Sequence, residues 1–159
     1  GGRVSAGSGA SRVSGDLPGG SLVGDSTFFN TGLNGLVNAV FNKHNQIIVI
    51  LDNGTTAMTG HQPNPGMDQE VLGETAAHLD IEAIVKALGV TRFAHVTPYH
   101  LQATLRVLAE MTEGAGARVL LAQEPCVLSA RRTPHTARPQ LSSVPDKGER
   151  PPASAPAFA

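Results

Sequence analysis

The chain has 159 residues, of which 40% are hydrophobic, and a formal net charge of −1 at pH 7. This length can bury one core of ordinary domain size, and the balanced charges offer no dense positive face for nucleic acid or an anionic membrane. The longest aliphatic run, residues 47–51, is far shorter than a membrane span, so we expect a cytoplasmic protein with neither a nucleic-acid nor a membrane partner.

The two ends of the chain lack a sustained hydrophobic pattern. Residues 1–20 are rich in Gly and Ser, and residues 129–159 hold 6 of the 11 prolines. Such compositions bury too little apolar surface to offset the entropy of ordering the backbone. We predict a loose lead-in over 1–20, one domain over 21–128 and a disordered tail over 129–159. Because the sequence starts with Gly1 rather than methionine, we also expect a fragment of a longer protein.

The first regular elements predicted are a helix and a strand. A helix is indicated by apolar residues at helical spacing, with Asn30 or Thr31 as its cap: Leu33, Leu36, Val37, Val40 and Phe41. Residues 46–51 follow as a short, β-branched apolar run. Such a run is typical of a parallel strand that is covered on both faces.

Two further helices alternate with two further strands. A helix near residues 81–88 has Asp80 as its cap and Gly89 as its end, and residues 93–96 form the next strand. Thr97 and Pro98 are expected to open a third helix that reaches Met111, and 118–122 is the last strand. This alternation predicts an α/β fold: a three-layer parallel sheet with helices on both faces.

Two loops carry the residues that suit a ligand, because parallel sheets bind ligands at the carboxyl ends of their strands. The first is Gly24-Asp25-Ser26-Thr27, which follows the short apolar pair Leu22-Val23 and precedes the first helix. The second starts at Asp52, after the strand 46–51, and is rich in side-chain oxygens. Its Asp52-Asn53-Gly54 sequence is also a tight-turn signal, so an ordinary hairpin is the alternative.

A magnesium ion is commonly shared between one or two carboxylate or amide side chains and the oxygens of a bound phosphate. Asp25 and Asn53 could serve as these side chains. They lie 28 positions apart, which is a suitable length for one strand–helix–strand crossover to the neighbouring strand. The sequence therefore predicts that both face one crevice.

These two loops resemble the motif of thiamine-diphosphate-dependent enzymes, which typically begins Gly-Asp-Gly and ends in asparagine. Residues 24–29, Gly-Asp-Ser-Thr-Phe-Phe, and residues 51–63, Leu-Asp-Asn-Gly-Thr-Thr-Ala-Met-Thr-Gly-His-Gln-Pro, are most similar to the large subunit of indolepyruvate ferredoxin oxidoreductases. The resemblance covers roughly residues 21–128 and implies a partial thiamine-diphosphate-binding fold.

The resemblance also implies roles for individual residues. Asp25, the Asn53 side chain and the Thr55 backbone carbonyl would bind Mg²⁺. The cofactor would contact both loops, through Gly24, Asp25, Ser26, Thr27, Asn53, Thr55, Thr56, Ala57 and Met58. His61 and Gln62 would approach the substrate. The chain would supply no catalytic residue, since the activating glutamate belongs to another domain.

The activity implied is oxidative decarboxylation of an arylpyruvate such as indolepyruvate to an acyl-CoA, with electrons passed to ferredoxin. The partners would be a pyrimidine-side domain, the small subunit, ferredoxin, coenzyme A and the 2-oxoacid. Iron–sulfur clusters would belong to the rest of the assembly, because the chain has one cysteine.

Three alternatives remain open at this stage. The same chemistry could act on another 2-oxoacid such as pyruvate. The chain could be a truncated, non-catalytic remnant, or another nucleotide-binding α/β domain in which the Gly24 loop holds a phosphate. No Walker-type Gly-Lys-Ser/Thr loop is present, which counts against the commonest nucleotide-binding version.

Overall fold

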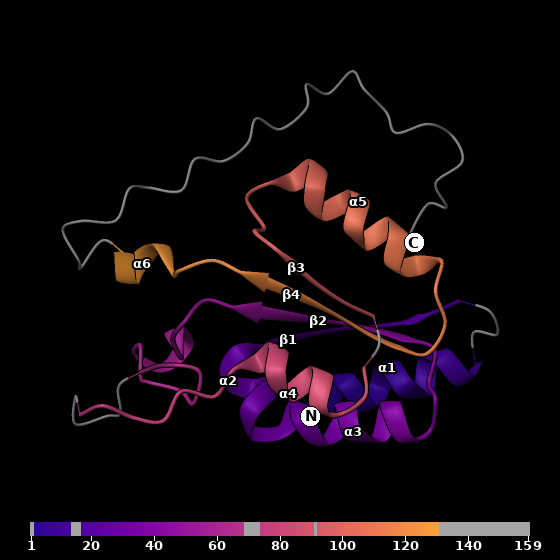
Figure 1. Cartoon of the computed structure of the whole chain (residues 1–159), viewed down its shortest axis with the longest axis horizontal. Helices are drawn as coiled ribbons and strands as arrows, with labels where there is room; N and C mark the ends of the chain where they lie inside the picture. The colour runs from indigo at the N-terminus through magenta and orange to yellow at the C-terminus, as the bar shows by residue number, and fades with distance from the viewer. Residues whose placement is uncertain (1, 14–16, 69–73, 91, 131–159) are drawn as a thin grey trace.

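A computed structural model describes residues 2–13, 17–68, 74–90 and 92–130 of the chain. Its centre is a four-stranded parallel sheet in the order β1-β2-β4-β3 (Figure 1). The strands are β1 (Gly19–Gly24), β2 (Gln46–Asp52), β3 (Arg92–Val96) and β4 (Ala117–Gln123). The strands predicted over 46–51, 93–96 and 118–122 are confirmed.

The helices connect these strands in chain order. They are α1 (Gly2–Val13), α2 (Asp25–Thr27), the π-helical η1 (Phe28–Gly32), α3 (Leu33–Phe41), the 3₁₀ turn η2 (Ala57–Thr59), α4 (Ile81–Ala87), α5 (Leu101–Thr112) and α6 (Val127–Ala130). None of the described helices is both long and apolar enough to cross a membrane.

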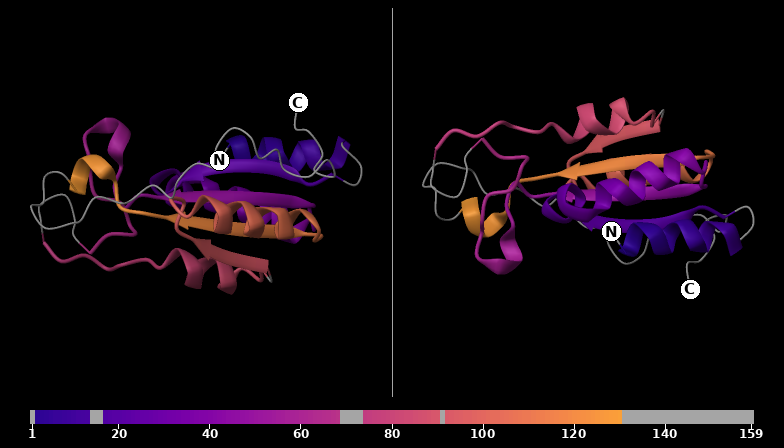
Figure 2. Two further views of the ribbon diagram at one scale, coloured as in Figure 1. Left: turned by 90° about the horizontal axis from the view of Figure 1, so that it is seen from above. Right: turned by 90° about the horizontal axis from the view of Figure 1, so that it is seen from below.

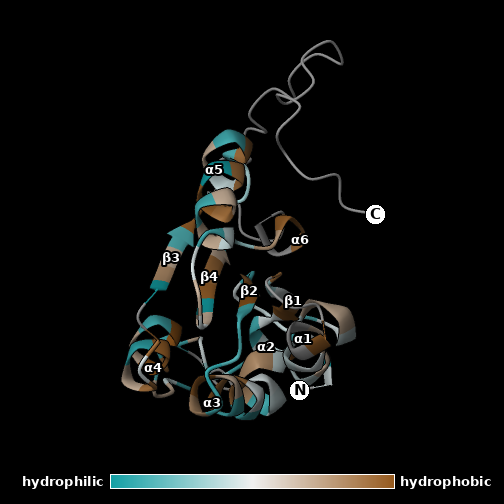
Figure 3. Ribbon diagram, turned by 90° about the vertical axis from the view of Figure 1, so that its right-hand side faces the viewer, coloured by the Kyte–Doolittle hydropathy of each residue, from teal (hydrophilic) through white to brown (hydrophobic). Residues whose placement is uncertain are grey.

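The sheet has helices on both faces, as predicted (Figures 2 and 3). On one face, α1, α3 and α4 pack against side chains such as Ile48 and Ile50. On the other face, Met111 of α5 packs against Ile47 and Leu120. Successive residues of a strand point to opposite faces, so the continuous apolar run of β2 supplies both cores. Burial on both faces fixes the position of the central strands.

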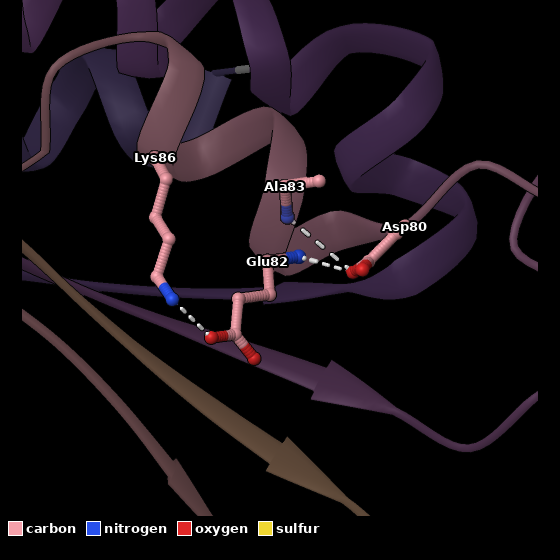
Figure 4. A network of polar contacts seen from close by, with 4 residues as sticks. All are labelled: Asp80, Glu82, Ala83 and Lys86. Atoms are coloured by element: carbon pink, nitrogen blue, oxygen red, sulfur yellow. Dashed lines mark hydrogen bonds and ion pairs between the residues drawn. The ribbon is translucent and has the colours of Figure 1, made fainter.

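The start of α4 shows why the chain turns helical there (Figure 4). The carboxylate of Asp80 accepts hydrogen bonds from the backbone N–H groups of Glu82, at 2.8 Å, and Ala83, at 3.4 Å. Lys86 then pairs with Glu82 at 2.5 Å, one helical turn apart. The helix is followed by Gly89 with φ +86°. The predicted cap and end of this helix are confirmed.

The loose lead-in predicted over residues 1–20 is wrong for the part that the structure describes. Residues 2–13 form α1, and β1 begins at Gly19. Val4 is 1% exposed, and a Cβ added at Gly35 would lie 2.8 Å from it. The small residues that suggested disorder instead let α1 approach α3 and the sheet closely. Of the predicted tail over 129–159, all but residues 129 and 130 of α6 lie outside the described residues.

Two predicted helix starts are also wrong. The helix predicted after the Gly24 loop begins at Asp25 and continues through α2, η1 and α3, so Asn30 and Thr31 are inside it and bond back to the carbonyls of Ser26 and Thr27. The loop that sequence reasoning placed before the helix is its first turn. Likewise α5 begins at Leu101, after a turn closed by the His100 N–H and the Thr97 carbonyl.

Candidate functional site

The carboxyl ends of β1 and β2 lie side by side. The register pairs Gly24 with Leu51, so Asp25 and Asp52 follow at the same edge of the sheet. β1 and β2 are therefore joined by one crossover, as the spacing between the two loops predicted. The hairpin alternative fails, because β2 pairs in parallel with β1 and β4 and the chain after Gly54 does not return along it.

Asp25 is a buried carboxylate at the start of a helical segment. It is 4% exposed. Its Oδ1 accepts a hydrogen bond from the Ser26 N–H at 2.7 Å, and its Oδ2 accepts one from the Asn64 amide at 3.0 Å. Burial raises the pKa of Asp25; these two donors lower it, and the nearby Asp52 carboxylate raises it further. The net effect is a raised pKa, so the surroundings stabilise the charged carboxylate of Asp25 less well than water does.

Asp52 is held in place beside Asp25. Its Oδ1 accepts a hydrogen bond from the Gly54 N–H at 3.0 Å, and its Oδ2 accepts one from the Gln123 amide at 2.7 Å. The Gln123 bond ties the end of β2 to the end of β4. Neither of the two salt bridges found among the described residues involves Asp25 or Asp52. A bound cation would offset the repulsion between the two carboxylates.

Asn53 and Thr55 form one tight turn next to these carboxylates. The Asn53 Oδ1 accepts a hydrogen bond from the Thr55 N–H at 3.1 Å, and Gly54 between them has φ +66°. Thr55 is 4% exposed, and its carbonyl accepts a bond from the Ala57 N–H at 3.0 Å. A carbonyl or amide oxygen has two lone pairs, so each oxygen keeps one for a metal. The direct partners of Asp25 are Ser26 and Asn64 rather than Asn53.

The rest of the second loop is a small closed turn. The Thr56 N–H donates to the Gln62 carbonyl at 2.9 Å, and the His61 N–H donates to the Thr56 carbonyl at 3.1 Å. Gly60, with φ +113°, and His61, with φ +61°, close the turn. Met58 at its tip is 97% exposed. Sequence reasoning assigned Met58 to the cofactor, but in the chain alone it faces solvent.

Oxygen atoms dominate the possible metal ligands at this edge. Among the described residues, no three His, Cys, Asp or Glu side chains gather into a metal site. The available donors are the Asp25 carboxylate, the Asn53 amide and the Thr55 carbonyl. Mg²⁺ favours such a set, because it is commonly bound through one or two carboxylates together with phosphate oxygens and water. The residues present therefore fit a magnesium–diphosphate group.

Sequence reasoning missed three polar residues of this edge: Asp52 as a charge beside Asp25, and Asn64 and Gln123 as the amides that hold the two carboxylates. Asp52 was within reach of sequence reasoning, since it ends the strand that neighbours β1. The two amides gave no such signal, because Asn64 is 39 positions from Asp25 and Gln123 is 71 from Asp52.

An open cavity of about 390 Å³ adjoins Asp52 and Asn53. Its walls come from the end of β2, the turn before α5 and the segment after β4, and include Tyr99, Glu124 and Cys126. Backbone bonds from Glu124 to the Asp52 carbonyl and from Cys126 to the Asn53 carbonyl, both 3.0 Å, join these walls. The cavity lies at the carboxyl ends of the strands, where this class of sheet binds ligands.

Comparison with known proteins identifies the class. The model of the thiamine pyrophosphate enzyme, C-terminal TPP binding domain, matches residues 1–122, and the chain belongs to this family. The match includes α1 and β1.

Two curated relatives have a more specific name. The chain is 42% identical over 110 residues to the indolepyruvate oxidoreductase subunit IorA of Methanothermobacter thermautotrophicus, a match that covers 69% of the chain and 18% of that subunit. It is 43% identical over 108 residues to IorA of Thermococcus kodakarensis, covering 68% of the chain and 16% of that subunit. The chain thus spans under a fifth of the length of these relatives.

A solved structure supports the fold. The 2-oxoglutarate:ferredoxin oxidoreductase from Magnetococcus marinus, determined with 2-oxoglutarate, coenzyme A and succinyl-CoA bound, superposes with a TM-score of 0.65. The match covers 78% of this chain and 46% of that chain, at 18% sequence identity.

Proposed function

We propose that this chain supplies the magnesium- and diphosphate-binding part of a thiamine-diphosphate-dependent 2-oxoacid:ferredoxin oxidoreductase that acts on indolepyruvate. One observation carries the proposal: a buried Asp25 carboxylate with a raised pKa lies beside Asp52 at the carboxyl edge of two neighbouring strands. Because the chain belongs to a thiamine-diphosphate-binding family, we assign this carboxylate to the metal that would hold the diphosphate.

The metal would be held by the Asp25 carboxylate, the Asn53 amide oxygen and the Thr55 carbonyl. The diphosphate would lie against the first turn of the helical segment that begins at Asp25, because free N–H groups and the helix dipole favour anions at such a start. Gly24, Ser26 and Thr27 belong to this region.

The second loop would cover the other side of the cofactor. The N–H groups of Thr56 and Ala57 already bond to carbonyls within the loop, so we assign the contact with the diphosphate to the Thr56 hydroxyl. Met58 would become covered when the cofactor and a pyrimidine-side domain bind. Its 97% exposure here is consistent with a surface that another domain completes.

Thiamine diphosphate, when bound, would supply the chemistry for decarboxylating a 2-oxoacid and for holding the electrons released. The role of this chain would be to bind the metal and the diphosphate and so to orient the cofactor. The activating glutamate, the iron–sulfur clusters and the sites for coenzyme A and ferredoxin would come from the rest of the subunit and from the small subunit.

The names of the relatives support our proposal for the substrate class. IorA proteins are named for indolepyruvate, and the cavity of about 390 Å³ beside Asn53 would receive part of a large 2-oxoacid, with His61 and Gln62 at the edge of the loop. A smaller 2-oxoacid such as pyruvate is the alternative. It would be indicated if the complete protein used pyruvate with a higher kcat/KM than indolepyruvate.

Thermal unfolding of the complete protein tests the proposal. Mg²⁺ and thiamine diphosphate together should raise the melting temperature, because a ligand that binds only the folded state stabilises it. Asp25→Ala should abolish this rise, and Asp68→Ala, which removes an exposed carboxylate, should retain it.

The same measurement separates the alternatives. A shift with ATP or NAD, and none with thiamine diphosphate, would indicate a different nucleotide-binding domain. A wild-type protein that responds to none of these ligands would indicate a non-catalytic remnant.

A further inference from the structure

We infer that Asn64 is a positioning residue that holds the Asp25 carboxylate in the orientation in which it binds the metal. The inference rests on the proposed function and extends it to a residue outside both loop motifs. Asn64 is 8% exposed, and its amide nitrogen donates to the Asp25 Oδ2 at 3.0 Å across 39 positions of sequence.

The orientation of the Asn64 amide is fixed by its other contact. Its Oδ1 accepts a hydrogen bond from the Gly66 N–H at 2.9 Å. Because the oxygen must face this donor, the NH₂ group must face Asp25. A rotated amide would place its oxygen against a carboxylate oxygen and its nitrogen against an N–H, losing both bonds. The hydrogen-bonding pattern thus presents a donor to Asp25.

The backbone around Asn64 is anchored independently of Asp25. The Asn64 carbonyl accepts a bond from Met67, and the Pro65 carbonyl accepts one from Leu79, both at 2.9 Å. Prolines at 63 and 65 restrict φ on either side of Asn64. The Asn64 amide that donates to Asp25 therefore belongs to a conformationally restricted segment.

Packing at Gly66 keeps this segment against the first loop. A Cβ added at Gly66 would lie 3.1 Å from the ring of Phe29 and 3.2 Å from the Asn64 Oδ1. A side chain here would require the Phe29 ring or the Asn64 side chain to shift by a few tenths of an ångström. Glycine at 66 thus suits the close packing of this segment beside Phe29 and Asn64.

The two bonds to Asp25 leave it suited to a cation. The Ser26 N–H occupies one lone pair of Oδ1 and Asn64 occupies one of Oδ2, so each oxygen keeps a second lone pair. The carboxylate is held at both oxygens by donors from two segments. Residues that hold a metal ligand in this way typically contribute 10- to 100-fold to metal affinity.

Manganese binding tests the role of Asn64. Mn²⁺ replaces Mg²⁺, and its free concentration is read by electron paramagnetic resonance in the complete protein with saturating thiamine diphosphate. Asn64→Ala should raise the Mn²⁺ dissociation constant by roughly 10- to 100-fold. Asn64→Leu, which fills the space without a donor, should give a similar loss. Asn42→Ala, which removes an exposed amide at the end of α3, is the matched control.

The outcomes separate a positioning role from a structural one. A purely structural residue would lower the melting temperature of the ligand-free protein and leave the Mn²⁺ dissociation constant of the folded variant unchanged. A folded Asn64→Ala or Asn64→Leu protein that binds Mn²⁺ within twofold of wild type overturns the inference. If wild type itself binds no Mn²⁺ with thiamine diphosphate, the proposed function fails instead.

Discussion

Replacing Gln46 by leucine should release α1 from the sheet. Gln46 is fully buried at the start of β2, where it accepts a hydrogen bond from the Ser8 hydroxyl at 2.7 Å and donates to the Ser21 hydroxyl at 2.6 Å and the Val4 carbonyl at 2.9 Å. Gln46→Leu preserves most of the side-chain volume and removes all three bonds. Ser8 and Val4 belong to α1, so the docking of that helix is what the change weakens.

The expected cost follows from the groups that lose partners. A buried polar group left without a partner costs about 1–3 kcal/mol. The Ser8 and Ser21 hydroxyls lose the Gln46 amide as a partner, and Ser21 keeps its bond to the Arg3 carbonyl, so we expect about 1–3 kcal/mol in total. Since 1.4 kcal/mol is a factor of ten in an equilibrium constant, opening of α1 should become roughly 5- to 150-fold more frequent.

Amide hydrogen exchange of α1 measures this opening directly. Gln102→Leu, an exposed change on α5, should leave the exchange rates of α1 unaltered. Combining Gln46→Leu with Ser8→Ala and Ser21→Ala should recover much of the protection, because apolar replacement of all partners leaves few polar groups unpaired. The reasoning is refuted if Gln46→Leu changes α1 exchange by less than about twofold, or if the triple variant is no better protected.

Three further outcomes are expected. The raised pKa of Asp25, caused by burial and then by Asp52, means that the folded state binds this proton more tightly than the unfolded state. The stability of the ligand-free protein should therefore fall as the pH rises from the ordinary aspartate pKa through the raised one. Mg²⁺ with thiamine diphosphate should make this fall smaller. Melting temperatures measured across this pH range, with and without the ligands, test both statements. Ile50→Ala, at a fully buried position of β2, should cost about 2–5 kcal/mol in urea unfolding. Asp80→Ala removes the cap of α4 and should cost about 1 kcal/mol, measured in the same way.

Local patterns were enough to predict most of the sheet. β2 and β4 are short apolar runs because both of their faces are buried, and α4 carries its cap and terminating glycine in its own sequence. The helix α1 has no such signal. It is held by the close approach of glycines and by the buried bonds of Gln46, and these depend on residues far away in the chain.

The candidate site also has a part that local sequence predicts and a part that it does not. Asp25 and Asn53 could be named from sequence because Asp25 follows the short apolar pair Leu22-Val23, Asn53 follows the predicted strand 46–51, and parallel neighbours end at one edge. The turn between Asn53 and Thr55 is equally local. The bond from Asn64 to Asp25 could not be foreseen, because its geometry depends on how a long connection folds back over the edge of the sheet.

Two neighbouring carboxylates at this edge of the sheet repel each other, which lowers the stability of the fold. Two amides and two backbone N–H groups hold Asp25 and Asp52 in fixed positions, yet the pKa of Asp25 is still raised. Carboxylates held in this way cannot move apart to relieve their repulsion. The divalent cation that we propose at this edge would offset that repulsion, and part of its binding free energy would come from doing so.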